Sequence, residues 1–386
     1  MPIEGFCEPR FEPVRDAFRT NFRDRGEVGA AVTIMLGGQT VVDLVGGYSD
    51  AAAEARWRPD TLVDFYSVGK GVLSLLLLEL VDAGAVELTT PVVEVWPEFA
   101  HGGKEWVTIA DALSHRAAVP AVRETLTDED LWSWDRMTGA LAATEPWWAA
   151  GERHAYHTNT FGHLVGELVR RVSGEMPGTR LRRIADPLGA DLHFGVPDAD
   201  LSRCAPVIWA APTGSPVAAP VPRDGLAGDA LMNLLAHFNP PGYSSVGVVN
   251  TARWRQIQVP STNGHGTATG LARLYSALTE PGRLVSPDLL SHATHTRSAG
   301  PCPILGEHVE FGLGFTPTGT RRPLGPNPHA FGHFGTGGAL GFADPLAGVG
   351  FGYVMNHVIP RWQSSRNRAL IDAFYGCLPD GGRVRR

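Results

Sequence analysis

Apolar residues recur at helical spacing near the start of the chain. Between residues 10 and 26 they return every three or four positions, which predicts an amphipathic helix. These positions are Phe11, Val14, Phe18 and Phe22. Two apolar stretches rich in β-branched residues follow, "GAAVTIMLGG" and "QTVVDLVGGYS", and the glycine pair between them predicts an antiparallel hairpin.

The other end of the chain repeats this combination of sheet and helix. The segment "LGFADPLAGVGFGYVMNHV" predicts two strands about a "DPLAG" turn, and "RNRALIDAFYGCL" predicts a closing helix. The middle, from about Leu88 to Gly189, is expected to be mostly helical, with helices in "TIADALSHRA" and "TFGHLVGELVRRVSG". The second of these ends on Gly174, in the manner of a helix C-cap.

A stretch rich in proline, glycine and alanine lies between residues 205 and 264. Such a stretch is either a disordered linker or a set of ordered loops that cover a site. Trp209, Phe238 and Tyr243 are interleaved in it and favour the second interpretation.

Composition excludes several classes of function. The chain has 386 residues, 43% hydrophobic and 19% charged, so it can bury a substantial core. Its net charge of -7 comes without a basic stripe, and we expect no nucleic-acid partner. No apolar stretch reaches the roughly 18 to 20 residues of a membrane span, and the first residues lack a signal-peptide pattern. We therefore expect a cytoplasmic protein with no membrane partner, whose four separated cysteines are reduced thiols.

The chain has only two lysines, Lys70 and Lys104, among 33 basic residues. Lys70 follows Ser67 by three positions, just before the apolar run "LSLLLLELV". On a helix, positions i and i+3 share one face, so the lysine amine can reach the serine hydroxyl. Burial lowers the pKa of a lysine, which suits a general base beside a nucleophile. The alternative is an N-capping serine followed by a solvated lysine.

Other catalytic signatures are missing from the sequence. No serine has glycines two places before and two places after it, which argues against an α/β-hydrolase. "SVGK" lacks the first glycine and the final Ser or Thr of a phosphate-binding loop. The pairs "HAYH" and "HATH" have no carboxylate or cysteine ligands at metal-binding spacing, so we expect neither a metal nor another cofactor. Tyr156, just before an amphipathic helix, is a candidate for the group that relays the proton.

Three motifs in this order resemble those of a known superfamily. S-x-x-K comes first, a tyrosine opens a helix about 90 residues further on, and H-x-G-x-G-G, at residues 333–338, precedes a C-terminal strand. The set resembles the serine β-lactamase and penicillin-binding-protein superfamily, and most closely the family VIII, class C β-lactamase-like carboxylesterases. Further matching segments include "WPEFA", "TIADALSHRAAVP", "PSTNGHGTATGLARLYSAL" and "GFADPLAGVGFGYVMN".

The resemblance implies an α+β protein with the β-lactamase/DD-peptidase-like fold, in which helices flank an antiparallel sheet. Residues 1–87 and 265–386 would form the α/β lobe from both chain ends. Residues 88–264 would form an inserted, mostly helical lobe, with the segment near 205–264 covering a site in the cleft between the lobes.

The resemblance also implies roles for individual residues. Ser67 would attack the acyl carbonyl, Lys70 would accept its proton, and Tyr156 would relay that proton. The backbone N-H groups of Ser67 and Thr336 would form the oxyanion hole. The residues expected to contact the substrate are His333, Phe334, Gly335 and Trp209.

Two departures from the β-lactamase pattern bear on the substrate. Thr158 stands where β-lactamases have asparagine. His333 stands where β-lactamases have the lysine that helps to hold the carboxylate of the β-lactam substrate. A small-molecule carboxylic ester is therefore the expected substrate, hydrolysed through an acyl-enzyme. The alternatives are acyl transfer, hydrolysis of an amide, peptide or β-lactam by the same acyl-enzyme, and a non-catalytic binding protein of the same fold.

Overall fold

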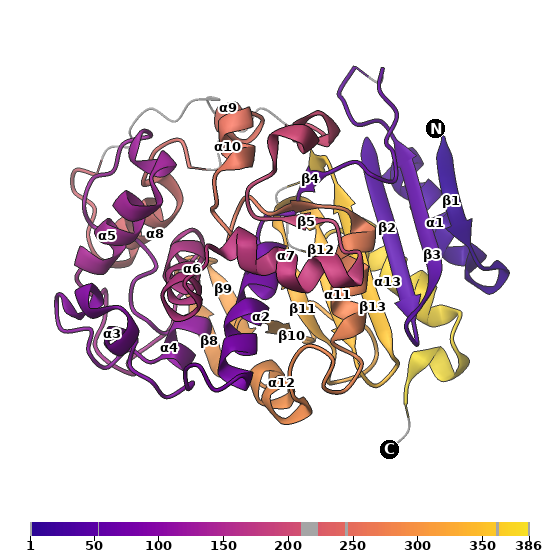
Figure 1. Cartoon of the computed structure of the whole chain (residues 1–386). Helices are drawn as coiled ribbons and strands as arrows, with labels where there is room; N and C mark the ends of the chain where they lie inside the picture. Colours follow the sequence, from indigo (N-terminus) through magenta and orange to yellow (C-terminus); the bar gives the residue numbers. More distant parts are fainter. Residues whose placement is uncertain (1, 53, 210–222, 244–245, 360–362, 385–386) are drawn as a thin grey trace.

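A seven-stranded antiparallel sheet forms the centre of the computed structural model, which describes residues 2–52, 54–209, 223–243, 246–359 and 363–384. The strand order is β1-β3-β2-β13-β12-β11-β10, so strands from both chain ends pair in one sheet (Figure 1). The strands are β1 (Ile3–Cys7), β2 (Gly29–Leu36), β3 (Gln39–Gly47), β10 (Thr316–Pro317), β11 (Phe331–Phe334), β12 (Leu340–Asp344) and β13 (Val349–Met355).

Both predicted strand pairs are confirmed. β2 and β3 form the first hairpin, and its turn residues Gly37 and Gly38 have φ values of 57° and 77°. Two successive positive φ values match the turn that follows the twist of a hairpin, and glycine adopts them without strain. β12 and β13 flank the predicted turn at residues 345–348.

Helices α1 (Glu12–Asp24) and α13 (Ser365–Gly376) cover one face of the sheet, which confirms the predicted N-terminal and closing helices (Figure 1). The ring of Phe11 stacks on Phe374 at 5.1 Å between centroids. A Cβ added at Gly46 of β3 would lie 2.9 Å from the Phe22 ring. The apolar side of α1 therefore packs directly on the sheet.

Helix α11 (Ala268–Ala277) packs on the opposite face, against β13 and β2. Two glycines of β13 permit this close approach. A Cβ at Gly350 would lie 2.4 Å from the Ser276 backbone nitrogen, and one at Gly352 would lie 2.1 Å from the Ala268 carbonyl oxygen. The glycine-rich strand therefore sets the distance between sheet and helix.

Helix α2 (Val68–Asp82) lies between the sheet and the helical side of the molecule (Figure 1). The predicted helix ending at Gly174 is confirmed as α6, and that glycine caps it with φ of 75°. The helix predicted in residues 108–117 is shorter, because α4 ends at Leu113 and the chain turns at His115, where φ is 63°. The division into two lobes at residues 87 and 265 stays a prediction.

The remaining helices with at least four residues lie outside the sheet. They are α3 (Val92–Val95), η2 (Pro97–Ala100), α4 (Ile109–Leu113), α5 (Trp134–Ala143), α6 (Thr160–Ser173), α7 (Pro177–Leu188), η4 (Asp198–Arg203), α8 (Gly228–Phe238), α9 (Val246–Val249), α10 (Ala252–Gln256), α12 (Pro287–Thr294) and η6 (Pro379–Gly382). Small strand pairs complete the fold. They join β4 (Val63–Asp64) and β5 (Leu192–His193) to β7 (His265–Gly266), β8 (Ser298–Cys302) to β9 (Glu307–Phe311), and β6 (Ile208–Trp209) to β14 (His357–Val358).

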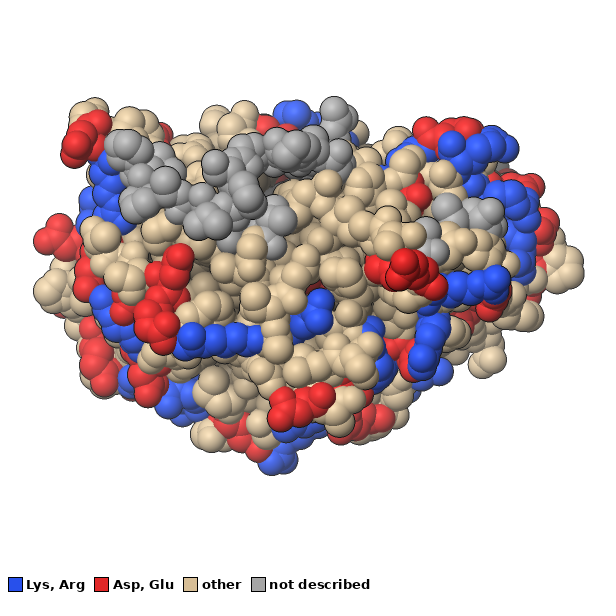
Figure 2. Space-filling view, turned by 90° about the horizontal axis from the view of Figure 1, so that it is seen from above, with Lys and Arg blue, Asp and Glu red and all other residues tan. Residues whose placement is uncertain are grey.

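Most charged side chains on the face seen in Figure 2 lie around its rim. Basic and acidic side chains alternate around its rim, and the described residues there form no continuous basic stripe. Among the described helices, none combines the length and the apolar character that crossing a bilayer requires.

Candidate active site

Ser67 stands at the start of α2, directly after a strained turn. Tyr66 has φ of 49°, a conformation that residues other than glycine rarely adopt. The Asp64 carboxylate accepts a hydrogen bond from the Tyr66 amide at 2.8 Å, which stabilises this turn. The Ser67 side chain makes no capping hydrogen bond, so the interpretation of Ser67 as a capping serine is wrong.

Lys70 is fully buried one helical turn from Ser67. Its Nζ lies 3.0 Å from Ser67 Oγ, and it also donates to the carbonyl oxygens of Thr158 at 2.7 Å and Ser261 at 3.0 Å. Burial lowers the pKa of Lys70 well below its ordinary value. The structure therefore brings the serine and the lysine together, in surroundings that favour a neutral amine.

The second lysine, Lys104, offers a useful contrast. It is also buried, and its Nζ donates to three backbone carbonyl oxygens, those of His101, Ala142 and Thr144. Burial lowers the pKa of Lys104 to about 8. Since all three partners are carbonyls, Lys104 joins chain segments, whereas one partner of Lys70 is a hydroxyl that can react.

Tyr156 lies in the segment that leads into α6, and its ring is buried beside the serine and lysine. The centre of the ring is 4.8 Å from Lys70 Nζ. Burial raises the pKa of the Tyr156 phenol, and a hydrogen bond with Ser67 acts in the opposite direction. The three residues predicted from the motifs therefore form one cluster.

His333 on β11 faces this cluster from the sheet. Its ring lies 6.3 Å from the Tyr156 ring, between centroids. Burial, and to a smaller extent the charge of Lys70, lower the pKa of His333 to about 3. The imidazole is therefore uncharged at neutral pH.

The segment after β11 runs against the turn that carries Ser67. A Cβ at Gly335 would lie 2.3 Å from the Phe65 carbonyl oxygen, so only glycine fits there. Thr336 follows at the start of η5 (Thr336–Gly338). The predicted oxyanion hole, made by the Ser67 and Thr336 amides, stays a prediction, and the close approach of the two segments is what it requires.

Phe334 and Trp209 are the other predicted substrate contacts with a side chain. Phe334 is fully buried in the hydrophobic core, and strand geometry directs its side chain away from the face that His333 occupies. Trp209 is half-buried on β6, which pairs with β14, and β14 packs against η5. The covering role of residues 205–264 stays a prediction, and residues 210–222 and 244–245 of that segment lie outside the described residues.

Sequence reasoning missed the two carbonyl groups that hold Lys70. Every residue carries a carbonyl, so no residue type marks this role. The side-chain amide of Asn159, next to Thr158, donates to the Ala236 carbonyl at 2.8 Å. The backbone carbonyl of Asn159 accepts from Ser261 Oγ at 2.8 Å, which ties together the two segments that contact Lys70.

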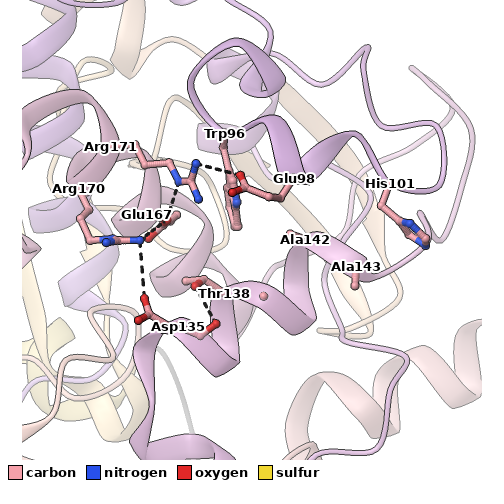
Figure 3. Close-up of a pocket in the computed structure, with 11 residues that line it drawn as sticks. Trp96, Glu98, His101, Asp135, Thr138, Ala142, Ala143, Glu167, Arg170 and Arg171 are labelled. Carbon is pink, nitrogen blue, oxygen red and sulfur yellow. Dashed lines mark hydrogen bonds and ion pairs between the residues drawn. The ribbon is translucent and has the colours of Figure 1, made fainter.

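A cavity of about 370 Å³ on the helical side lies among α5, α6 and η2, and none of the predicted site residues lines it (Figure 3). Glu167 binds Arg170 and Arg171 at 2.7 Å each, and Arg171 also binds Glu98 at 2.9 Å. Because these charges are paired with one another, we assign the cavity no catalytic role. In the described part of the chain, no group of three His, Cys, Asp or Glu side chains could hold a metal ion.

Gly139 in α5 opens into this cavity, and its replacement gives a stability prediction. We expect Gly139→Ala to raise the free energy of unfolding by about 0.5–1 kcal/mol, because alanine favours helix over glycine. A Cβ at this position meets no atom within 4 Å. Urea unfolding of the purified variant measures the change.

Gly166→Ala in α6 is the matched control, since its Cβ would lie 2.6 Å from the Trp134 ring. It gains the same helix propensity but must displace the indole, so we expect a lower free energy of unfolding. Equal shifts in the two variants would show that the free space beside Gly139 does not decide the change in stability.

The chain is similar to known proteins over nearly its whole length. The family model described as Beta-lactamase matches residues 14–374. Over 376 residues the chain is 33% identical to Esterase/beta-lactamase LipL of Mycobacterium tuberculosis. The alignment covers 92% of this chain and 83% of that protein.

Two solved structures share the fold. The crystal structure of a family VIII carboxylesterase has a TM-score of 0.89 and 35% identity, over 98% of this chain and 100% of that chain. A penicillin-binding protein homolog from Caulobacter crescentus has a TM-score of 0.88 and 38% identity over the same shares of both chains.

Proposed function

Because the chain belongs to the beta-lactamase family, we propose that it hydrolyses carboxylic esters through an acyl-enzyme formed on Ser67. The chain is a serine hydrolase of the beta-lactamase fold with esterase relatives. The observation that carries the finer proposal is the position of Lys70 Nζ, 3.0 Å from Ser67 Oγ and held by two carbonyls.

The two carbonyls give Lys70 the orientation of a general base. A neutral amine has two N-H groups and one lone pair. When the N-H groups bind the carbonyls of Thr158 and Ser261, the lone pair is directed at the remaining neighbour, Ser67 Oγ. Lys70 can then take the hydroxyl proton while Oγ attacks the ester carbonyl carbon.

Tyr156 is the proposed relay to the leaving alcohol. Its hydrogen bond with Ser67 and its closeness to Lys70 Nζ support a path for the proton from the ammonium to the departing oxygen. In the second half-reaction the same groups would activate the water that releases the acid. The Ser67 and Thr336 amides would stabilise the oxyanion in both steps.

The uncharged His333 favours a neutral substrate, because it supplies no fixed cation for a carboxylate.

A small-molecule ester and a cytoplasmic location are both part of the proposal. Acyl transfer, or hydrolysis of an amide, peptide or β-lactam, would use the same acyl-enzyme. The Mycobacterium tuberculosis relative, whose name joins esterase and beta-lactamase, makes the β-lactam alternative the one to test.

A comparison of two substrates tests this proposal. We expect short-chain aryl esters to be hydrolysed with a higher kcat/KM than a chromogenic cephalosporin. The uncharged His333 cannot give the cephalosporin carboxylate a charge-assisted hydrogen bond. The loss of one such bond costs about 1.5–3 kcal/mol, which lowers kcat/KM for the cephalosporin by about 10–200-fold. Steady-state rates on both substrates, with mass spectrometry of the intact protein to detect acyl adducts, measure this. A cephalosporin cleaved as efficiently as the best ester would reject the proposed substrate class.

Two variants of one residue sharpen the comparison. His333→Lys is expected to raise kcat/KM for the cephalosporin about tenfold, by adding one charge-assisted contact, with little change for neutral esters. His333→Asn is polar but uncharged, so it should not improve cephalosporin hydrolysis. An equal gain in both variants would show that charge at residue 333 does not select the substrate.

A further inference from the structure

Three consecutive backbone amides around Tyr156 are held by only two residues. The Ala155 amide donates to the His115 carbonyl oxygen at 3.2 Å, and the His157 amide donates to His115 Nδ1 at 3.1 Å. Between them, the Tyr156 amide donates to Cys302 Sγ at 3.3 Å. His115 therefore binds the chain on both sides of Tyr156.

The conformation of His115 makes this double contact possible. Its φ of 63° lies in the left-handed region, where the chain turns sharply after α4. The turn brings the carbonyl oxygen and the ring Nδ1 of His115 to the same segment, residues 155–157. Only 1% of the residue is exposed, and its ring lies 5.0 Å from the Tyr156 ring and 4.5 Å from the Phe311 ring, between centroids.

We propose that His115 is a positioning residue that sets where the Tyr156 hydroxyl lies relative to Ser67 and Lys70. The inference rests on the proposed function, in which Tyr156 relays the proton. His115 lies in the segment "TIADALSHRAAVP", one of those that carry the family resemblance, yet the motifs assign it no role.

The chemistry of the contact specifies one form of the ring. Nδ1 accepts the His157 amide proton, so it carries no proton itself, and the neutral ring has its hydrogen on Nε2. The His157 ring adds a local tie, with Nδ1 at 2.7 Å from the Ala155 carbonyl oxygen. Residues 155–157 thus form a hydrogen-bonded turn that three residues hold from outside. They are His115, Cys302 and Val119, whose amide donates to His157 Nε2 at 3.4 Å.

Two substitutions with the same side-chain branching separate the hydrogen bond from the ring. His115→Asn keeps an acceptor near the position of Nδ1 and tolerates the left-handed conformation, whereas His115→Leu has no acceptor. When a catalytic group is displaced by about 1 Å, the reaction rate can fall by about 10²-fold. We expect His115→Leu to lower kcat for an aryl ester by about 10–100-fold with KM nearly unchanged. His115→Asn should stay within about threefold of the wild type.

A double-mutant cycle with Tyr156→Phe shows whether His115 acts through the tyrosine. We expect His115→Leu to change kcat by less than about twofold in the Tyr156→Phe background. Should His115→Leu fail to fold, His115→Gly takes its place, because glycine adopts the left-handed conformation freely.

Each other outcome overturns the inference. An equal loss in both backgrounds, or an equal loss for the asparagine and leucine variants, would show that His115 does not position Tyr156, while the proposed function would stand. Full activity of Tyr156→Phe alone would reject the relay role of Tyr156, and the role of His115 with it.

Discussion

Ser67→Ala is expected to lower ester hydrolysis by about 10³-fold or more, because Ser67 Oγ is the atom proposed to form the acyl-enzyme. Ser67 Oγ is a hydroxyl oxygen that lies 3.0 Å from Lys70 Nζ. Purified wild-type and variant protein, assayed on the best aryl ester, give the ratio of kcat/KM.

Covalent labelling identifies the nucleophile independently of turnover. An activated fluorophosphonate should add one group to the wild-type protein, at Ser67, and none to Ser67→Ala. Ser74→Ala is the matched control, since Ser74 is a buried serine of the same helix whose hydroxyl binds the Lys70 carbonyl oxygen at 2.7 Å. Labelling of another serine, or an equal loss of activity in Ser74→Ala, would contradict the assignment.

Lys70→Met is expected to lower kcat/KM by about 10²–10⁴-fold, because the methionine side chain cannot accept a proton. Lys70→Arg should be similarly inactive, since a guanidinium stays protonated in proteins. The wild-type kcat/KM should rise with pH through the pKa of Lys70. Burial places that pKa well below its ordinary value, so the plateau should come at lower pH than for an exposed lysine.

Lys104→Met is the matched control for burial. It leaves three carbonyls without their donor, so it should lower the free energy of unfolding but leave kcat per folded molecule unchanged. Rates are compared after the folded fraction has been measured by urea unfolding. If Lys70→Met lost only stability, and not kcat, Lys70 would be a structural residue like Lys104.

The motifs, through the resemblance that they carry, predicted the family and the fold class, and both predictions are confirmed. The two strand pairs, α1, α13 and α6 depend on short-range spacing and on turn or cap residues, which the sequence displays directly. The relation between Ser67 and Lys70 is of the same kind, since one helical turn separates them. The helix predicted over residues 108–117 was too long, because nothing in its spacing signals the turn at His115.

The sequence by itself therefore determined the family, the sheet made from both chain ends, and the pairing of serine with lysine. Only the tertiary structure decided what surrounds that pair. The carbonyls that orient Lys70 belong to residues 88 and 191 positions away along the chain, and His115 reaches the segment around Tyr156 from 42 positions away. Backbone carbonyls and amides are common to nearly all residues, so only the folded chain selects which of them meet a catalytic side chain.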